Sequence, residues 1–320
     1  MEKKSFDISQ LYIVDFVKNL GRKKNIFAMI YLLINVVIIT LIMQMFEPNI
    51  WLCILYGVGL YALTATIALS PLGEWFFRRT NGCKKIEDPA IAGRLEPLFR
   101  EVKEQAKEKH PDFIIDEKIS LYICDDDALN AFALGRRTVC VTRGLLQLDD
   151  EQIKGVLGHE FGHLASHDTD LTLLITVGNF LISAAITMFR VILWFYNLII
   201  SIVGAIMGGD EGWLVSAMSS LSSWLGTLMI NGLMWLWTQL GILLVMKSSR
   251  DAEYEADAFS CDLGYSEGML SFFHILERME GTPTKDRNNI FAALSASHPE
   301  TSKRIARIEA RAALPEPEVE

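Results

Sequence analysis

The chain has 320 residues, of which 51% are hydrophobic, and its formal net charge is -9. This length allows about two domains, and the hydrophobic share is high for a soluble enzyme. Acidic residues outnumber basic ones, so the chain lacks the basic footprint of a nucleic-acid-binding protein. The five cysteines form no C-x-x-C pair, which indicates free thiols in a reducing compartment and neither a disulfide framework nor a thiolate zinc site.

Two apolar stretches near the N-terminus are each close to the ~20 residues that a helix needs to cross a bilayer. They run from Ile26 to Phe46 and from Ile50 to Leu69, and a three-residue polar turn separates them. They predict a transmembrane hairpin over residues 26–70, preceded by a cytoplasmic segment over residues 1–25. A cleaved signal peptide is the alternative for the first stretch, but no small-residue cleavage site follows it before the second stretch begins.

Residues 71–170 have the composition of a globular domain. Apolar residues recur at helical spacing between Leu95 and Lys109, which predicts an amphipathic helix. A small sheet is predicted by strand-like patterns at three places, of which the last two form a hairpin: Ile119–Cys124, Ala131–Leu134 and Thr138–Thr142.

Two longer apolar regions follow, Leu171–Gly209 and Trp213–Met246, separated by an acidic pair. Each exceeds one bilayer crossing. Two long helices that project beyond the lipid are one interpretation, and four shorter spans with a break at Arg190 are the other. We favour a long transmembrane helical hairpin over residues 171–246. A buried helix pair of a soluble protein is disfavoured by the length of the runs and by the tryptophans along them.

Globular composition resumes over residues 247–314, and the tail 315–320, rich in proline and glutamate, is expected to be disordered. Pro299 is expected in the first turn of the last helix. Three helices are predicted here, at Asp251–Leu263, Gly268–Met279 and Thr301–Leu314. Lysines and arginines flank the apolar regions, whereas the turns between them are acidic, so the positive-inside rule puts both termini and the polar segments in the cytoplasm.

The sequence His159-Glu160-Phe161-Gly162-His163 is an H-E-x-x-H pattern inside a predicted helix that a capping-box-like start at Asp149 begins. Two imidazoles one turn apart on one helix face can share a metal ion, with the glutamate beside it. A catalytic zinc takes three protein ligands and keeps a fourth position for water. Glu253 and Asp257, one helical turn apart, are candidates for the third ligand. A chance match on a solvated helix face is the alternative.

Several motifs together resemble the HtpX family of membrane zinc metalloproteases, which are relatives of the CaaX prenyl proteases. They are the H-E-x-x-H pattern, two intervening apolar regions, R-x-x-E-Y-x-A-D over residues 250–257, and a late His298-Pro299. The segment N-A-F-A at residues 130–133 is also similar to that family. The resemblance covers most of the chain, from the first apolar hairpin to His298.

The resemblance implies that His159, His163 and Glu253 bind one Zn²⁺ per chain. It implies that Glu160 is the catalytic acid/base in hydrolysis of a peptide bond by a water molecule that zinc activates. Asp257 would accept a hydrogen bond from a ligating imidazole and so orient it.

Three further expectations concern residues around this group. His167 is not expected to be a ligand, because a side chain one turn beyond His163 would have to bend back towards the metal. Asp168 is expected to support the helix or a metal-bound histidine, and His298 to donate a hydrogen bond to the developing oxyanion. An extended peptide substrate is expected to pair with a strand edge formed by Asn130, Ala131, Phe132 and Ala133.

The expected fold is mainly α: a multi-span helical membrane protein with a cytoplasmic zincin-like (gluzincin) α+β protease domain that contains a small β-sheet. The resemblance implies the bacterial cytoplasmic (inner) membrane and substrates that are misfolded or damaged membrane proteins. A selective prenyl-protein processor and a membrane scaffold or channel with structural zinc are the competing interpretations. The scaffold predicts a closed four-ligand site. The sequence leaves the oligomeric state open.

Overall fold

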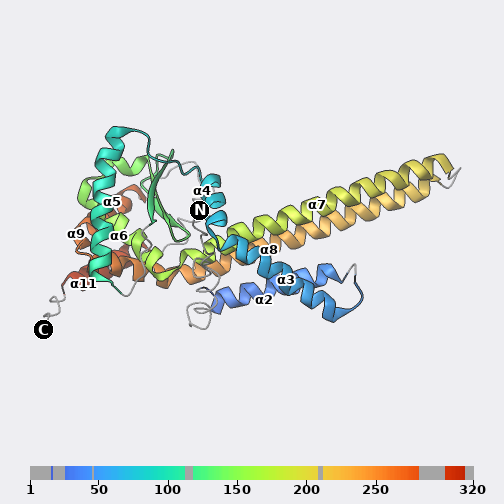
Figure 1. Cartoon of the computed structure of the whole chain (residues 1–320), viewed down its shortest axis with the longest axis horizontal. Helices are drawn as coiled ribbons and strands as arrows, with labels where there is room; N and C mark the ends of the chain where they lie inside the picture. The colour runs from blue at the N-terminus through green and yellow to red at the C-terminus, as the bar shows by residue number, and fades with distance from the viewer. Residues whose placement is uncertain are drawn as a thin grey trace, which may run out of the picture.

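The computed structural model of the chain describes residues 16, 26–44, 47–111, 118–207, 212–280 and 300–313. It shows a globular part, built from a small sheet and the helices around it, and two helical hairpins that extend from one side of this part (Figure 1). Most of the expected N-terminal segment lies outside the described residues. So do the expected tail, Pro299 and His298.

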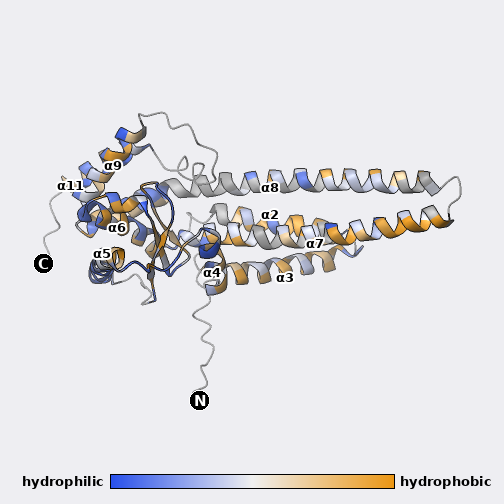
Figure 2. Cartoon of the chain, turned by 90° about the horizontal axis from the view of Figure 1, so that it is seen from above, coloured by the Kyte–Doolittle hydropathy of each residue, from blue (hydrophilic) through white to orange (hydrophobic). Residues whose placement is uncertain are grey.

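The shorter hairpin consists of α2 (Ile26–Met43) and α3 (Ile50–Ala68). Asn49 caps α3, because its side chain accepts hydrogen bonds from the backbone N–H groups of Trp51 and Leu52. This hairpin lies beside the root of the longer one, with α3 against α7 and α2 against α8 (Figures 1 and 2).

The longer hairpin consists of two unbroken helices, α7 (Thr169–Met207) and α8 (Gly212–Asp262). Helix α7 continues through Arg190, so the structure has two long helices here and not four shorter ones. The expected boundary between a span ending at Met246 and a separate helix from Asp251 is wrong, because α8 runs through both positions. The intervening Lys-Ser-Ser-Arg contains neither glycine nor proline, so nothing in it ends a helix.

Two helical segments of the described residues are long and apolar enough to cross a membrane, Ile50–Ala68 and Ile186–Gly204. Met29–Leu41 and Thr169–Gly178 are apolar but shorter. Figure 2 colours most residues in the outer half of α7 as hydrophobic. Large apolar side chains there are exposed, among them Trp194 at 60%. An exposed apolar surface of this extent is typical of a membrane-associated protein. The full number of spans stays a prediction.

The sheet has three strands in the order β1-β3-β2. Strand β3 (Thr138–Thr142) pairs in parallel with β1 (Ser120–Cys124) and antiparallel with β2 (Ala131–Leu134), which confirms the predicted hairpin. Strand β2 therefore lies at one edge of the sheet. The inner face of β3 carries Val139 and Val141, which are fully buried in the main core.

Helices cover the sheet and complete the globular part around α6, whose Leu157 and Phe161 are fully buried. Helix α11 begins at Thr301, as predicted, with Glu300 as its N-cap. The helices of this part, besides the C-terminal end of α8, are α4 (Pro71–Thr80), α5 (Pro89–Lys109), the short 3₁₀ helix η3 (Gly144–Gln147), α6 (Asp150–Ser166), α9 (Ser266–Glu280) and α11 (Thr301–Ala312).

The β2–β3 turn is attached to both hairpins. Glu74 on α4, which follows the shorter hairpin, accepts hydrogen bonds from the backbone N–H groups of Arg136 and Arg137, both at 3.2 Å, and from the Thr138 hydroxyl at 2.6 Å. The Arg136 guanidinium lies 2.6 Å from a carboxylate oxygen of Asp170, in the first turn of α7. These contacts fix the edge strand relative to the apolar helices.

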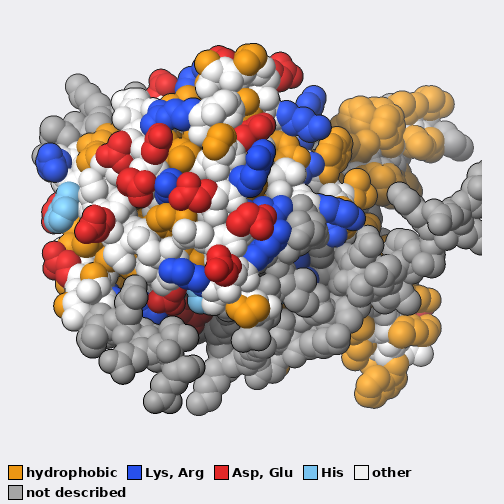
Figure 3. Space-filling view, turned by 60° about the vertical axis from the view of Figure 1, so that its left-hand side comes forward, with side chains coloured by type: hydrophobic (Ala, Val, Ile, Leu, Met, Phe, Trp, Pro, Cys, Tyr) orange, Lys and Arg blue, Asp and Glu red, His pale blue; other side chains and the backbone are white. Residues whose placement is uncertain are grey.

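Figure 3 shows the face of the globular part that is turned away from the hairpins. Acidic and basic side chains alternate over it, whereas hydrophobic side chains gather on the projecting helices. A charged and mixed surface is typical of a protein face in contact with water. The charged globular part therefore suits water, and the apolar hairpins suit a lipid bilayer.

Candidate active site

Helix α6, which carries the H-E-x-x-H residues, has a defined start and end. The capping box at its start is confirmed: Asp149 accepts from the Gln152 N–H at 2.9 Å, and the Gln152 side chain accepts from the Asp149 N–H at 3.1 Å. At its end His167 has a left-handed φ of 58°. His167 therefore leaves the helical face of His163, and within the described part of the chain it is not a member of the group that could hold a metal ion.

Two glycines of α6 allow α8 to approach closely. A Cβ atom at Gly162 would lie 2.8 Å from the Cα of Ala256, and one at Gly158 would lie 2.7 Å from the hydroxyl oxygen of Ser260. Any larger residue would push α8 away, since real side chains do not tolerate such distances. The close approach brings Glu253, one turn before Ala256 on α8, to the two histidines of α6.

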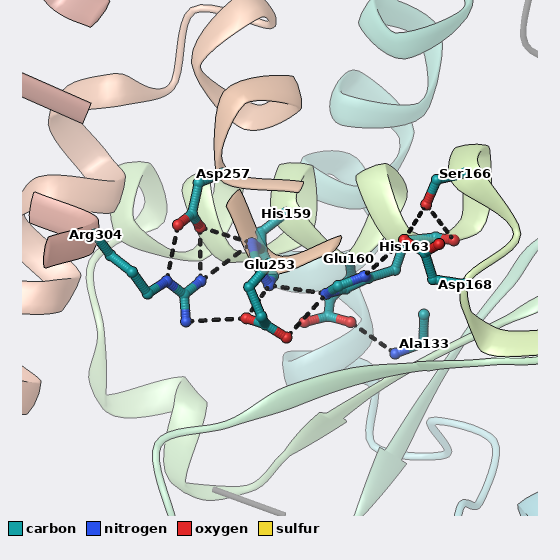
Figure 4. A network of polar contacts seen from close by, with 9 residues as sticks. All are labelled: Ala133, His159, Glu160, His163, Ser166, Asp168, Glu253, Asp257 and Arg304. Carbon is teal, nitrogen blue, oxygen red and sulfur yellow. Dashed lines mark hydrogen bonds and ion pairs between the residues drawn. The ribbon is translucent and has the colours of Figure 1, made fainter. Parts of the chain in front are cut away.

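His159, His163 and Glu253 each offer one ligand atom, and these atoms lie within 4.8 Å of one another. The two Nε2 atoms are 3.1 Å apart, and each lies 3.5 Å from one of the Glu253 carboxylate oxygens (Figure 4). Two imidazoles and one carboxylate are a ligand set of catalytic zinc sites. The residues present therefore fit a zinc ion held by three side chains.

Each imidazole directs its other ring nitrogen at a carboxylate. Nδ1 of His159 lies 2.9 Å from Asp257, and Nδ1 of His163 lies 3.7 Å from Asp168, which also accepts a hydrogen bond from Ser166 (Figure 4). A carboxylate within hydrogen-bond distance fixes the orientation and the tautomer of a metal-binding imidazole, as Asp257 does for His159, whereas Asp168 lies beyond that distance from His163. Asp257 and Asp168 thus each lie beside a different histidine, where the sequence analysis expected such a partner.

Arg304 on α11 belongs to this group and was not predicted. Arg304 is 6% exposed, and its guanidinium donates two hydrogen bonds to Asp257, at 2.8 and 2.6 Å. A third guanidinium nitrogen lies 3.0 Å from Glu253, and the group stacks over the Phe273 ring at 4.4 Å. One signal could have found it: buried carboxylates require a buried cation, and Arg304 lies one turn before the apolar Ile308 on an amphipathic helix.

Glu160 lies between the metal group and the edge strand. It is 6% exposed, and its Oε2 accepts a hydrogen bond from the Ala133 N–H at 2.7 Å (Figure 4). Asn130, directly before β2, and Phe132 within it pair with β3, so Ala131 and Ala133 turn their backbone groups to the open edge. Three of the four predicted substrate-binding residues therefore belong to the edge strand beside the candidate base, and Asn130 directly precedes it.

The residues in Figure 4 carry more negative than positive charge. Four carboxylates surround the histidines: Glu160, Asp168, Glu253 and Asp257. Burial, the largest influence, raises the pKa of Glu160. Burial alone would lower the pKa of His159 and His163, but the carboxylates outweigh it and raise both. A divalent cation would compensate this negative charge, since Arg304 is the only permanent cation among the residues drawn.

One predicted residue lies outside the described part of the chain, and one acidic residue next to the site's carboxylates in sequence is exposed. His298, the expected oxyanion donor, lies outside the described residues, and its role stays a prediction. Glu255 is exposed, whereas Glu253 and Asp257 on the same helix are each 3% exposed.

Comparison with known proteins places the chain in a family. A model of peptidase family M48 matches residues 92–312. Protease HtpX of Idiomarina loihiensis is 28% identical over 81% of this chain and 85% of its own length. The protease HtpX homolog of Desulfotalea psychrophila is 25% identical over 80% of this chain and 88% of its own length. The protease HtpX homolog of Lactobacillus helveticus is 30% identical over 59% of this chain and 66% of its own length.

Among solved structures, Ste24p of S. mikatae aligns with 94% of this chain and 67% of its own, at 14% identity and a TM-score of 0.40. The family assignment rests on the sequence matches, because the family model covers more than half of the chain. These matches confirm the resemblance to the HtpX proteases that the motifs indicated. The chain is a membrane-associated protease of peptidase family M48.

Proposed function

We propose that this chain is a zinc-dependent endopeptidase that hydrolyses peptide bonds of misfolded or damaged membrane proteins on the cytoplasmic side of the bacterial inner membrane. The observation that carries the proposal is the convergence of His159, His163 and Glu253 on one point, with the buried carboxylate of Glu160 next to it. A closed structural site would need a fourth protein ligand, and the group within the described ranges offers three.

Zinc is the proposed ion, one per chain, because the imidazoles and the carboxylate match its ligand preference. When bound, zinc supplies a Lewis acid that polarises the substrate carbonyl and lowers the pKa of a water molecule to ~7. Asp257 holds the His159 imidazole in the ligating orientation, and Asp168 lies beside His163. Arg304 fixes Asp257 through two hydrogen bonds and offsets part of the charge of Glu253.

Glu160 is the proposed general base and acid. It accepts the proton of the attacking water and later delivers it to the leaving amine. The hydrogen bond from Ala133 holds Oε2, so we assign the proton transfer to Oε1. Burial raises the pKa of this carboxyl group, which suits a group that must both take and release a proton near neutral pH.

The substrate is proposed to pair in an extended conformation with the open edge of β2. Ala131 and Ala133 turn their backbone groups to that edge, and Ala133 also contacts Glu160. Strand addition therefore brings a peptide bond of the substrate next to the base. Because the recognition uses backbone hydrogen bonds, we expect loose sequence specificity, as degradation of damaged proteins requires.

The membrane location of the substrates is supported by the apolar hairpins and by the β2–β3 turn that joins them to the edge strand. The cytoplasmic side is supported by the lysines and arginines that flank the apolar regions. The relatives named protease HtpX support proteolysis.

Proteolysis of an unfolded membrane protein by the purified, detergent-solubilised chain tests the proposal. Cleavage that a chelator abolishes and added zinc restores is the expected result. The matched control is Glu160→Gln with zinc bound. Stoichiometric zinc without hydrolysis of any unfolded substrate would instead assign the metal a structural role in a membrane scaffold.

A further inference from the structure

Two cysteines meet on the outer face of the sheet, opposite the face that Val139 and Val141 bury in the core. Cys140 pairs with Tyr122 across the parallel strands, and Cys124 lies two residues after Tyr122 on β1. Because side chains alternate along a strand, Cys124 and Cys140 share the outer face. Both are buried, Cys124 at 7% and Cys140 at 0% exposure.

A third cysteine reaches the same place through an isolated bridge. Lys84 and Ile123 form an antiparallel pair that exchanges two backbone hydrogen bonds, of 2.8 and 2.9 Å. The adjacent pair in this antiparallel register is Cys83 opposite Cys124. It is a non-hydrogen-bonded pair, in which the two Cα atoms are typically ~4.5 Å apart. Disulfides span Cα separations of about 4.4–6.8 Å, so this register suits a disulfide between Cys83 and Cys124 without a large backbone movement.

A cavity of about 220 Å³ is lined by Cys124 and by both chain neighbours of Cys83. Its lining includes Cys124, Gly82 and Lys84 next to Cys83, and Phe132 and Thr142 of the neighbouring strands. A small hydroperoxide fits such a volume. The Cys124 thiol can therefore meet an oxidant although its side chain is buried.

Cys140 forms hydrogen bonds that affect how readily the neighbouring Cys124 thiol loses its proton. Its hydrogen bond to Cys124 is the largest influence on Cys124 and lowers the pKa of that thiol, against burial and the cavity-lining Asp126 and Asp125, which raise it. The pKa of Cys140 itself is raised by its hydrogen bonds with Cys124 and Cys83. The thiolate is the form that reacts with oxidants. Cys124 lines the cavity and Cys140 does not, so Cys124 is the thiol placed to react, and Cys140 is its neighbour on the same face of the sheet.

We propose that Cys124 is a site of reversible oxidation by hydroperoxides, that Cys83 resolves the oxidised Cys124 to a disulfide, and that Cys140 is a positioning residue for Cys124. The proposal is independent of the proteolytic function. The sequence alone indicates five free thiols without a shared role, whereas the proposal gives related roles to three of them. Disulfides in reducing compartments are usually transient and redox-sensing.

The chemistry uses two electrons and one hydroperoxide. The Cys124 thiolate attacks the terminal oxygen, the O–O bond breaks, and the released alkoxide takes a proton and leaves as an alcohol, or as water when the oxidant is hydrogen peroxide. The Cys83 thiol then attacks the sulfenic sulfur, an S–S bond forms, and the hydroxyl group leaves with the thiol proton as water. Both cysteines are oxidised together, and the hydroperoxide is reduced.

Thiol mapping by mass spectrometry tests the proposal on the full chain in detergent, after treatment with hydrogen peroxide and alkylation. We expect loss of two alkylatable thiols, a crosslinked peptide pair that contains Cys83 and Cys124, and full reversal by dithiothreitol. Cys83→Ser should leave a sulfenic acid on Cys124 that dimedone traps. Cys261→Ser, at a distant half-buried thiol, is the matched control and should behave like the unchanged chain.

The role of Cys140 has its own readout. Cys140→Ser should keep the Cys83–Cys124 link but slow its formation near pH 7, and the difference should narrow as the pH rises and the Cys124 thiolate forms without help. Thermal unfolding of each variant checks that the fold is intact. A disulfide through Cys140, sulfenic acid confined to another cysteine, or full alkylation after peroxide treatment would overturn the proposal.

Discussion

The carboxylate of Glu160 is buried, receives one backbone hydrogen bond and lies beside the candidate metal ligands. Glu160→Gln keeps the size of the side chain and an oxygen that can accept from Ala133, but it removes the base. We therefore expect retained zinc and a loss of rate of about 10²–10⁴-fold. Elemental analysis and cleavage assays on one preparation decide the matter, and turnover equal to the unchanged chain would contradict the mechanism.

Glu253 and Glu255 are a matched pair on one helix, the first buried against the histidines and the second exposed. A metal that binds only the folded state raises the unfolding temperature. Added zinc should stabilise the Glu255→Ala variant like the unchanged chain and leave Glu253→Ala unaffected. Asp257→Ala should weaken zinc affinity by about 10–100-fold, as loss of a carboxylate behind a ligand does. Equal zinc responses of the two glutamate variants would mean that the assignment of Glu253 is wrong.

His298 is predicted to stabilise the transition state without binding the metal at rest. His298→Ala should then lower kcat by roughly 10²–10³-fold, the typical effect of one lost oxyanion donor, with zinc stoichiometry unchanged. Loss of zinc would make His298 a ligand, and an unchanged kcat would remove it from the mechanism.

Single residues could be predicted from the sequence where their partners lie on the same helix turn. His159, Glu160 and His163 are fixed relative to one another by helix geometry, and Glu253 and Asp257 likewise. Arg304 was missed because its contact with Asp257 joins helices 47 positions apart in the chain. A contact of this kind arises from tertiary packing, and helix spacing carries no information about it.

At the level of elements, the close contact of α6 and α8 depends on glycine. Gly162→Ala should destabilise the fold by about 1–3 kcal/mol, the usual cost of overpacking, and weaken zinc binding because α8 carries Glu253. Gly93→Ala on α5, where nothing lies within 4 Å, is the control and should be neutral or stabilising by up to about 1 kcal/mol. Thermal unfolding with and without zinc measures both. Tolerance of Gly162→Ala would show that α8 can shift without affecting the site.

The elements themselves were largely predictable from periodicity and capping signals, as the β2–β3 hairpin and the capping box of α6 show. Two features were not. Helix α8 is continuous because no breaker separates its apolar and polar parts, although composition suggested a boundary after Met246. The parallel pairing of β1 with β3 depends on how the chain crosses over between them, which strand patterns do not encode.

At the level of the whole molecule, the distribution of charge predicts the orientation in the membrane. Single cysteines introduced at Asn49 and at Asp210 should react with an impermeant maleimide from outside the cell, in a background whose native thiols are replaced. Cysteines at Gly82 and at the C-terminus should not react. The reason is that lysines and arginines are retained on the cytoplasmic side. Reaction at Gly82 from outside would place the protease domain on the wrong face and end the proposed role in the cytoplasm.

The two arms of the long hairpin end in the candidate metal site, because α7 begins directly after Asp168 and α8 carries Glu253 and Asp257. A change in the tilt of the hairpin therefore rotates the hairpin about its end at the site. At 1.5 Å per residue, the part of α8 between Gly212 and Glu253 is about 60 Å long, so a tilt of about 1° corresponds to ~1 Å at the far end. Transmembrane helices tilt to match bilayer thickness. We therefore expect the bilayer thickness around the long hairpin to influence the orientation of the turn of α8 that carries Glu253.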